Sequence, residues 1–174
     1  VPGANQGNLI DGECTSLTVN STSQTPTITA PSGEKSIQSA MIGTYTVGAS
    51  QTYTTLTAAA NDISLRGVSG AVTFSLESDY SSTNETFPIS ITQYTGQSVV
   101  NTLNIKPATG VSAVISGSPS GSASLIQLLG ADYVTIDGSN NGTTTRNLTF
   151  TNTGTVGLTA GVQISSLSSS NGAT

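Results

Sequence analysis

The chain has 174 residues, of which 34% are hydrophobic and 7% are charged, and its formal net charge is −5. This length is sufficient for one domain with a core, and the small net charge separates the chain from sequences that are disordered because of charge. The basic residues Lys35, Arg66, Lys106 and Arg146 are scattered, so we expect neither nucleic-acid binding nor attraction to an anionic membrane. No apolar run approaches the ~18 residues of a membrane span.

Residues 1–42 differ from the rest of the chain because they contain scattered prolines and a Thr/Ser-rich alternating stretch. We predict an extended tail or linker, with short strands at 17–20 and 25–29. Polar strands of this kind are suited to strand addition on a sheet edge of the same domain or of a neighbouring subunit. Cys14 is the single cysteine. It is either an unpaired thiol or the site of a bond to a partner in an oxidising compartment.

The domain is predicted to begin with a strand at 43–48, followed by the only convincing helix at about 54–66. Its apolar residues recur on one helical face, and they are Leu56, Ala59, Ala60 and Ile63. Thr54 or Thr55 is suited to the N-cap, and Gly67 is suited to end the helix in a left-handed conformation.

After Gly70 the sequence predicts a ladder of short strands with alternating apolar residues and Gly, Asn, Asp or Ser between them. The expected strands are 71–76, 87–92, 102–106, 112–116, 124–129, 133–137, 148–152 and 161–165. An antiparallel β-sandwich and a parallel solenoid both use such strands. Very short strands with Asn- and Gly-containing turns favour the solenoid. A helix before the ladder also fits, since it can cover the open first coil.

Several segments resemble known proteins; they are 43–48, 53–60, 66–74, 105–108, 114–117, 129–143 and 146–153. These segments are similar to β-helix regions in large secreted, adhesin-like surface proteins of Bacteroidota-type bacteria. The resemblance covers about residues 43–174. It implies an all-β fold, a right-handed parallel β-helix with an N-terminal capping helix and an extended N-terminal tail. It also implies an extracellular, cell-surface location.

Histidine is absent, which removes the commonest general base and a common metal ligand. Two acidic pairs remain as candidates for glycoside cleavage, Glu77 with Asp79 and Asp132 with Asp137, because that reaction needs two carboxylates across a groove. The sequence around each pair is more typical of surface loops and turns. We therefore expect no catalytic residues, no cofactor and no enzyme activity.

The segment 137–142, Asp-Gly-Ser-Asn-Asn-Gly, is rich in oxygen atoms, as calcium loops are. It has one carboxylate and lacks the regular acidic spacing, so turn chemistry is the better explanation and no metal site is expected. The five tyrosines could stack on sugars if they shared a face, and they are Tyr45, Tyr53, Tyr80, Tyr94 and Tyr133. The glycosylation pattern Asn-x-Ser/Thr occurs at Asn20, Asn84, Asn141 and Asn147.

The ladder stops near 168–174 without a capping helix or a polar terminal repeat. We expect the last coil to continue in a longer chain or to be covered by another subunit. Repeated head-to-tail contact between subunits would make a fibre.

The sequence thus predicts an extracellular structural or adhesive surface protein that self-associates head to tail as a stalk or filament subunit. The alternatives are an ordinary module of a long secreted chain and a β-helix that binds or cleaves carbohydrate, with surface glycans as partners.

Overall fold

The computed structural model describes residues 39–120, 124–155 and 159–166, in a compact unit that begins at Ser39. Several sequence predictions lie outside these residues: the strands at 17–20 and 25–29, Cys14, Asn20 and the chain end at 168–174. In the described part of the chain we find no helix long and apolar enough to cross a membrane.

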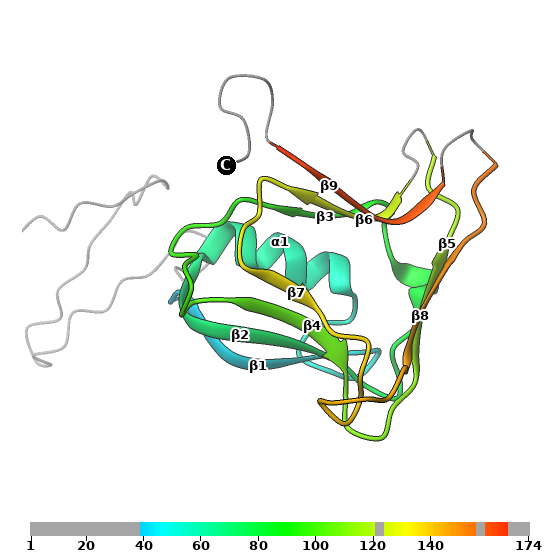
Figure 1. The fold of residues 1–174 in the computed structure, drawn as a ribbon, viewed down its shortest axis with the longest axis horizontal. Coiled ribbons are helices and arrows are strands. Elements are labelled where there is room, and N and C mark those ends of the chain that lie inside the picture. Colours follow the sequence, from blue (N-terminus) through cyan, green and yellow to red (C-terminus); the bar gives the residue numbers. More distant parts are fainter. Residues whose placement is uncertain (1–38, 121–123, 156–158, 167–174) are drawn as a thin grey trace, which may run out of the picture. The chain divides into compact units, whose positions relative to one another are not determined.

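The described residues form nine strands, one α-helix and one 3-10 turn (Figure 1). In chain order they are β1 Met41–Val47, α1 Leu56–Arg66, β2 Val68–Leu76, η1 Ser82–Asn84, β3 Ile89–Thr92, β4 Leu103–Pro107, β5 Ala113–Gly117, β6 Ser124–Leu129, β7 Val134–Ile136, β8 Leu148–Asn152 and β9 Ala160–Ser165. Each predicted strand of the ladder has a counterpart here, with ends that differ by a few residues.

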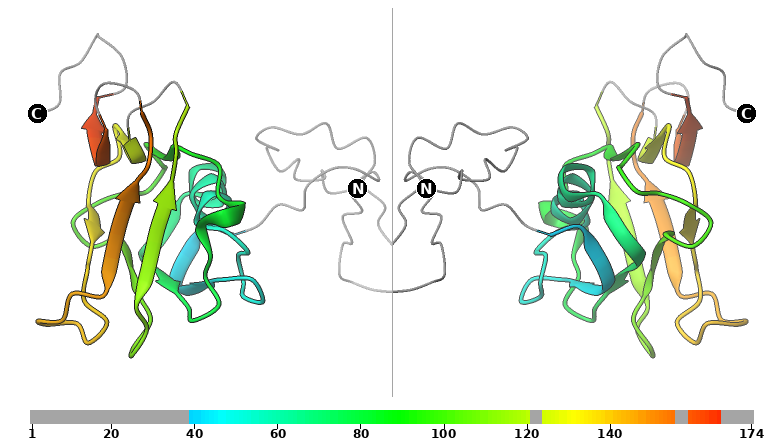
Figure 2. Two further views of the ribbon diagram at one scale, coloured as in Figure 1. Left: turned by 90° about the vertical axis from the view of Figure 1, so that its right-hand side faces the viewer. Right: turned by 90° about the vertical axis from the view of Figure 1, so that its left-hand side faces the viewer.

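The strands form three sheets, with the orders β1-β2-β4-β7, β3-β6-β9 and β5-β8. All pairings between these strands are parallel, so the antiparallel sandwich considered from the sequence is wrong. From β4 the chain visits the three sheets in turn through β5 and β6, and it then visits them in the same order through β7, β8 and β9. Figures 1 and 2 show the later strands lying beside their earlier counterparts.

The register of the largest sheet keeps apolar side chains in line from strand to strand. Val72 pairs with Leu103, and Leu103 pairs with Val134, in equal steps along the chain. Phe74, Ile105 and Ile136 form the next such line. Alternate residues of a strand point to opposite faces, so the apolar lines face the core and the polar residues between them face outward.

Helix α1 begins one residue after the cap Thr55, whose side chain accepts a hydrogen bond from the backbone N–H of Ala58 at 3.0 Å. The predicted helix at 54–66 is therefore correct at its end and starts slightly early. Gly67 ends the helix with φ 65°, as predicted. A Cβ at this glycine would lie 2.6 Å from the carbonyl oxygen of Thr95, so close packing also requires glycine there.

The predicted boundary between the tail and the domain, at 42/43, falls inside β1. Met41 is fully buried, and its backbone N–H donates to the carbonyl oxygen of Gly67 at 2.9 Å. The register shifts between Met41 and Gly43, where Gly43 has φ 91°. This irregularity interrupts the alternating pattern and hides the start of the strand from sequence reasoning.

Two polar groups outside α1, the Glu85 carboxylate and the Ser39 carbonyl, hold its two ends. The Glu85 carboxylate accepts the backbone N–H groups of Leu56 at 2.6 Å and of Thr57 at 2.8 Å, which satisfies two unpaired donors of the first turn. In the last turn Arg66 pairs with Asp62 at 2.9 Å, and its Nε donates to the carbonyl oxygen of Ser39 at 2.8 Å. The helix is thus held both to the loop before β3 and to the chain before β1.

Candidate functional site

The acidic residues after β2 have separate structural tasks. Asp79 accepts hydrogen bonds from the Ser50 backbone N–H at 2.8 Å and the Gln51 side-chain amide at 3.2 Å, so it holds the loop that follows β1. Glu77 accepts from the Ser75 hydroxyl at 2.9 Å and lines a groove described below. Asp79 does not line that groove. The structure therefore does not present Glu77 and Asp79 as two carboxylates facing one ligand.

The second acidic pair lies at opposite ends of β7. Asp132 precedes the strand and exchanges hydrogen bonds with Gln97 at 3.3 Å, while Asp137 follows the strand and lies 3.7 Å from Lys106 Nζ. Each carboxylate is engaged by a different neighbour, so the structure does not present Asp132 and Asp137 as two carboxylates facing one ligand across a groove.

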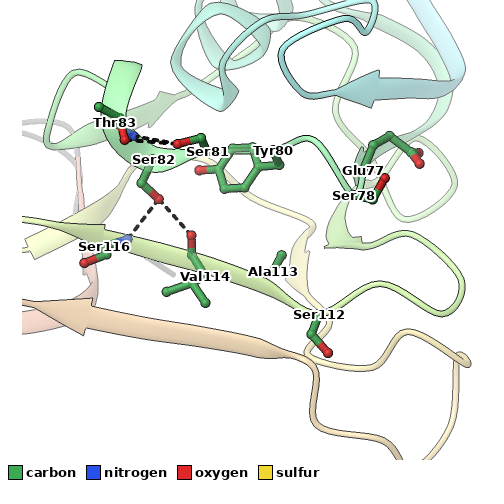
Figure 3. Close-up of a pocket in the computed structure, with 10 residues that line it drawn as sticks. All are labelled: Glu77, Ser78, Tyr80, Ser81, Ser82, Thr83, Ser112, Ala113, Val114 and Ser116. Atoms are coloured by element: carbon green, nitrogen blue, oxygen red, sulfur yellow. Dashed lines mark hydrogen bonds between the residues drawn. The ribbon is translucent and has the colours of Figure 1, made fainter.

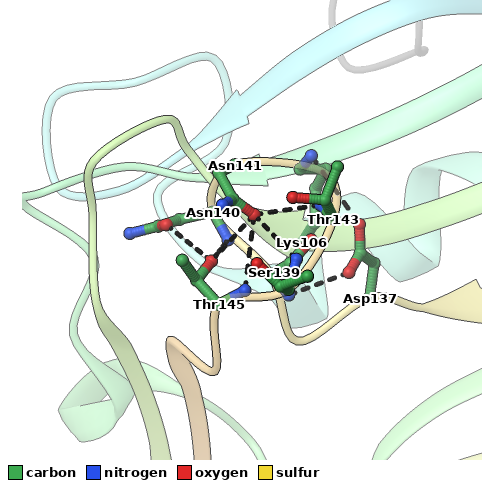
Figure 4. Close-up of polar contacts among 8 residues, drawn as sticks. Lys106, Asp137, Ser139, Asn140, Asn141, Thr143 and Thr145 are labelled. Atoms are coloured by element: carbon green, nitrogen blue, oxygen red, sulfur yellow. Dashed lines mark hydrogen bonds and ion pairs between the residues drawn. The ribbon is translucent and has the colours of Figure 1, made fainter.

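The loop after β7 is a set of side-chain turns (Figure 4). Asn141 Oδ1 accepts the backbone N–H groups of Thr143, Thr144 and Thr145 at 2.9, 3.2 and 3.4 Å. Asp137 Oδ1 accepts the backbone N–H of Ser139 at 2.8 Å. These contacts account for the residue pattern as turn chemistry.

The same contacts lower the pKa of the Asp137 carboxyl group. The Ser139 backbone N–H, then the Ser139 side chain, and with a smaller effect the Lys106 ammonium hold the pKa of Asp137 below its usual value. The described residues contain no group of three or more His, Cys, Asp or Glu side chains that could hold a metal ion.

The tyrosines do not act as one surface. Tyr45 and Tyr53 lie with their ring centroids 5.9 Å apart, and the Tyr53 hydroxyl donates to Asp62. Tyr94 is buried, and its hydroxyl donates to the carbonyl oxygen of Asp132 at 3.1 Å. Burial, and then the charge of Asp132, raise the pKa of Tyr94 to about 12. Tyr133 is half exposed and has φ 56°, a left-handed conformation that is rare for such a residue.

The described asparagines of the glycosylation pattern differ in their availability. Asn84 is exposed in η1. Asn147 uses its side-chain amide to donate to the Ser112 hydroxyl at 2.9 Å, and Asn141 is held by the turn described above. Asn84 and Asn141 are exposed, whereas Asn147 is partly buried.

A groove between the loop after β2 and strand β5 is the feature that sequence reasoning missed (Figure 3). Its volume is about 400 Å³, and its lining residues are Glu77, Ser78, Tyr80, Ser81, Ser82, Thr83, Ser112, Ala113, Val114 and Ser116. The loop side and the β5 side are far apart in sequence. The only local signal is the run Ser81-Ser82-Thr83, which interrupts the strand ladder and reads as an ordinary polar loop.

One wall of the groove is built by Tyr80. Its hydroxyl oxygen is buried and makes no hydrogen bond of normal geometry among the described residues, although Ser82 and Glu85 lie near it. Burial, and then the negative charge of Glu85, raise the pKa of this hydroxyl. Because its oxygen is not open to solvent, the Tyr80 side chain stays neutral. Its part in the groove is that of a lining residue.

Comparisons of this chain with protein-family models, with curated proteins and with solved structures found no match.

Proposed function

We propose that this chain is a right-handed parallel β-helix that serves as an extracellular structural or adhesive surface protein. The repeated order of visits to the three sheets supports coils, with β4-β5-β6 as one coil and β7-β8-β9 as the next. Equal steps between Val72, Leu103 and Val134 support a regular coil length in the largest sheet.

The observation that carries the proposal is the change in burial along the stack of coils. Ile105 on β4 is 0% exposed, whereas its register partner Ile136 on β7 is only partly buried. Leu128 on β6 is 7% exposed, whereas its register partner Ile164 on β9 is 79% exposed. The coil of β7, β8 and β9 therefore exposes apolar side chains at positions whose counterparts in the earlier coil are buried.

This end, which we name the open end, consists of β7, β8 and β9. Each is an edge strand within the described sheets, so its outward N–H and C=O groups have no strand partner there. A further parallel coil would pair these groups and cover the apolar side chains together. Such an end is suited to another coil of the same kind.

The opposite end, which we name the helix-bearing end, is covered by helix α1. Helix α1 buries Leu56 and Ile63 against the first strands, but Leu65 on α1 and Ile42 on β1 are 69% and 61% exposed. We propose that the open end of one copy meets this helix-bearing end of the next, with their exposed apolar residues in contact. This contact is heterologous, and repeating it produces a filament or stalk.

The chemical character of the surface supports an extracellular role. Only 7% of residues are charged, and the outward positions of β2 and its neighbours are mainly Thr, Ser and Asn. A rigid, polar and nearly uncharged coil is suited to a spacer between a cell and its surroundings.

Sedimentation velocity and negative-stain electron microscopy of the full chain test this proposal. We expect association that increases with protein concentration and filaments along the coil axis. Ile164→Lys places a charge on an already exposed edge position and is expected to abolish association without lowering the unfolding midpoint. The matched control Val99→Lys changes a residue that is 76% exposed in the loop before β4 and is expected to associate normally.

A full chain that stays monomeric at every concentration would contradict self-association. Equal behaviour of Ile164→Lys and Val99→Lys would contradict the assignment of the contact to the open end.

A further inference from the structure

The groove beside β5 lies where the stack of coils lacks a strand. β2 and β3 belong to the sheets of β4 and β6, but the chain between them passes β5 without adding a strand to the β5-β8 sheet. The 3-10 turn η1 occupies part of that place. One edge of β5 therefore faces a loop and a groove in place of a neighbouring strand (Figure 3).

Ser82 shows how part of this edge is satisfied. Its hydroxyl donates to the carbonyl oxygen of Val114 at 2.8 Å and accepts the backbone N–H of Ser116 at 3.0 Å. A single side chain thus replaces the two hydrogen bonds that a strand would make with this half of β5. The other half of the edge has no such substitute.

The unpaired half is defined by the alternation of the strand. The Ala113 N–H donates to the carbonyl oxygen of Asn147 at 2.8 Å, so the backbone groups of Ala113 face β8. Backbone groups alternate in direction along a parallel strand, so the N–H of Val114 and the C=O of Ser112 face the groove. Neither has a hydrogen-bond partner among the described residues.

These two groups have the spacing that a parallel strand recognises. One residue of an added strand can donate its N–H to the Ser112 carbonyl and accept the Val114 N–H with its own carbonyl, which places it opposite Ala113. An antiparallel strand would use both groups of one residue, and the carbonyl of Val114 is already bonded to Ser82. The free pair therefore favours the parallel direction.

The remaining walls of the groove are suited to a peptide. Its volume of about 400 Å³ lies within the ~300–1,000 Å³ range of ligand pockets. Most of the lining residues are Ser and Thr, in contrast to the apolar lining usual for small-molecule pockets. Glu77 is the one charged residue among them, so a basic side chain near the bound segment is favoured.

We propose that the groove binds an extended peptide segment, which adds to β5 as a short parallel strand with a basic side chain near Glu77. The binding mode is strand addition, in which backbone hydrogen bonds supply affinity and side-chain contacts supply specificity. The exposed Val114 side chain, which is 48% exposed, provides an apolar contact for a side chain on the same face of the added strand.

The test uses the full chain and a synthetic peptide, acetyl-Thr-Val-Lys-Val-Thr-amide, in an amide hydrogen-exchange and heteronuclear NMR titration. We expect shifts at Ser112 and Val114 and at least tenfold slower exchange of the Val114 N–H at saturating peptide. The matched control is the same peptide with an N-methyl group on the residue that pairs with Ala113. It cannot donate to Ser112 and is expected to bind at least tenfold more weakly.

A second measurement tests the charge. Replacing the peptide lysine by glutamate is expected to weaken binding to the parent protein several-fold. In the Glu77→Gln variant we expect the two peptides to bind with nearly equal affinity. Glu77→Gln keeps the shape of the side chain, and unfolding curves check that the fold is retained.

Equal binding of the N-methylated peptide, or no change at Val114 at millimolar peptide, would overturn the proposal. A response of the same amides to a neutral oligosaccharide but not to the peptide would overturn it as well. A monomeric chain that binds the peptide would refute the filament proposal and leave this one standing, because the groove is separate from the open end.

Discussion

The two ends of the parallel sheets, the helix-bearing end and the open end, differ in how their apolar side chains are covered. At one end α1 buries Leu56, Ala59, Ala60 and Ile63, which are all at most 1% exposed. At the open end the core-facing residues of β7 and β8 are only partly buried. A coil cannot cover its own apolar cross-section, so each end requires a separate cover. The described chain contains that cover at the helix-bearing end and exposes apolar side chains at the other.

The strongest test of this difference compares two isoleucines in register, Ile105 on β4 and Ile136 on β7. Ile105→Ala removes a fully buried side chain and is expected to cost about 2–5 kcal/mol of unfolding free energy. Ile136→Ala is expected to cost below about 2 kcal/mol, because its site is already partly open. Urea unfolding followed by circular dichroism at low protein concentration measures both. Equal losses would show that the open end is covered in solution.

The stability of the helix-bearing end is expected to depend on the Glu85 carboxylate, which caps α1. Glu85→Gln keeps the size of the side chain but removes the charge that accepts the first backbone N–H groups of α1, so we expect a loss of about 1–3 kcal/mol. The measurement is thermal unfolding, with Glu77→Gln as the matched control, since Glu77 accepts one hydroxyl and no helix N–H. Similar losses in both variants would contradict the capping role.

The open end has a point of backbone strain next to β7. Tyr133 has φ 56°, so Tyr133→Gly is expected to raise the unfolding free energy by up to about 1 kcal/mol through relief of that strain. Tyr133→Ala removes the ring without relieving the backbone and is expected to be neutral or destabilising. Differential scanning calorimetry of the two variants separates the effects. A less stable glycine variant would show that the ring contributes more than the strain.

The smallest expected effect concerns Asp137, which follows β7 and pairs with Lys106 on the neighbouring strand β4. Its pKa is lowered in the folded state, so the stabilisation is present above the unfolded pKa and is lost as pH falls through the folded value. For a contact this exposed we expect less than about 1 kcal/mol. Asp137→Asn is expected to match the parent at acidic pH and to be slightly less stable at neutral pH. Urea unfolding at both pH values measures this, and a pH-independent difference would contradict it.

Sequence reasoning was most successful where the pattern is local. Val72, Phe74 and Leu76 alternate with polar residues, and the structure places them in β2 with their side chains buried. It was less successful at Met41, because the irregularity at Gly43 breaks the alternation there. The acidic pairs were identified as residues but not in their roles, since the partners of Asp79 and Asp132 come from segments distant in sequence.

The sequence by itself determined the approximate positions of most strands in the described residues, as well as helix α1 and its end at Gly67, because periodicity and turn chemistry act between near neighbours. Only the tertiary structure decided which strands pair, that all pairings are parallel, and that Ser82 takes the place of a strand beside β5. The physical reason is that pairing and burial depend on groups brought together from distant parts of the chain. The open end and the groove are each formed by segments that are far apart in sequence, so no local pattern records them.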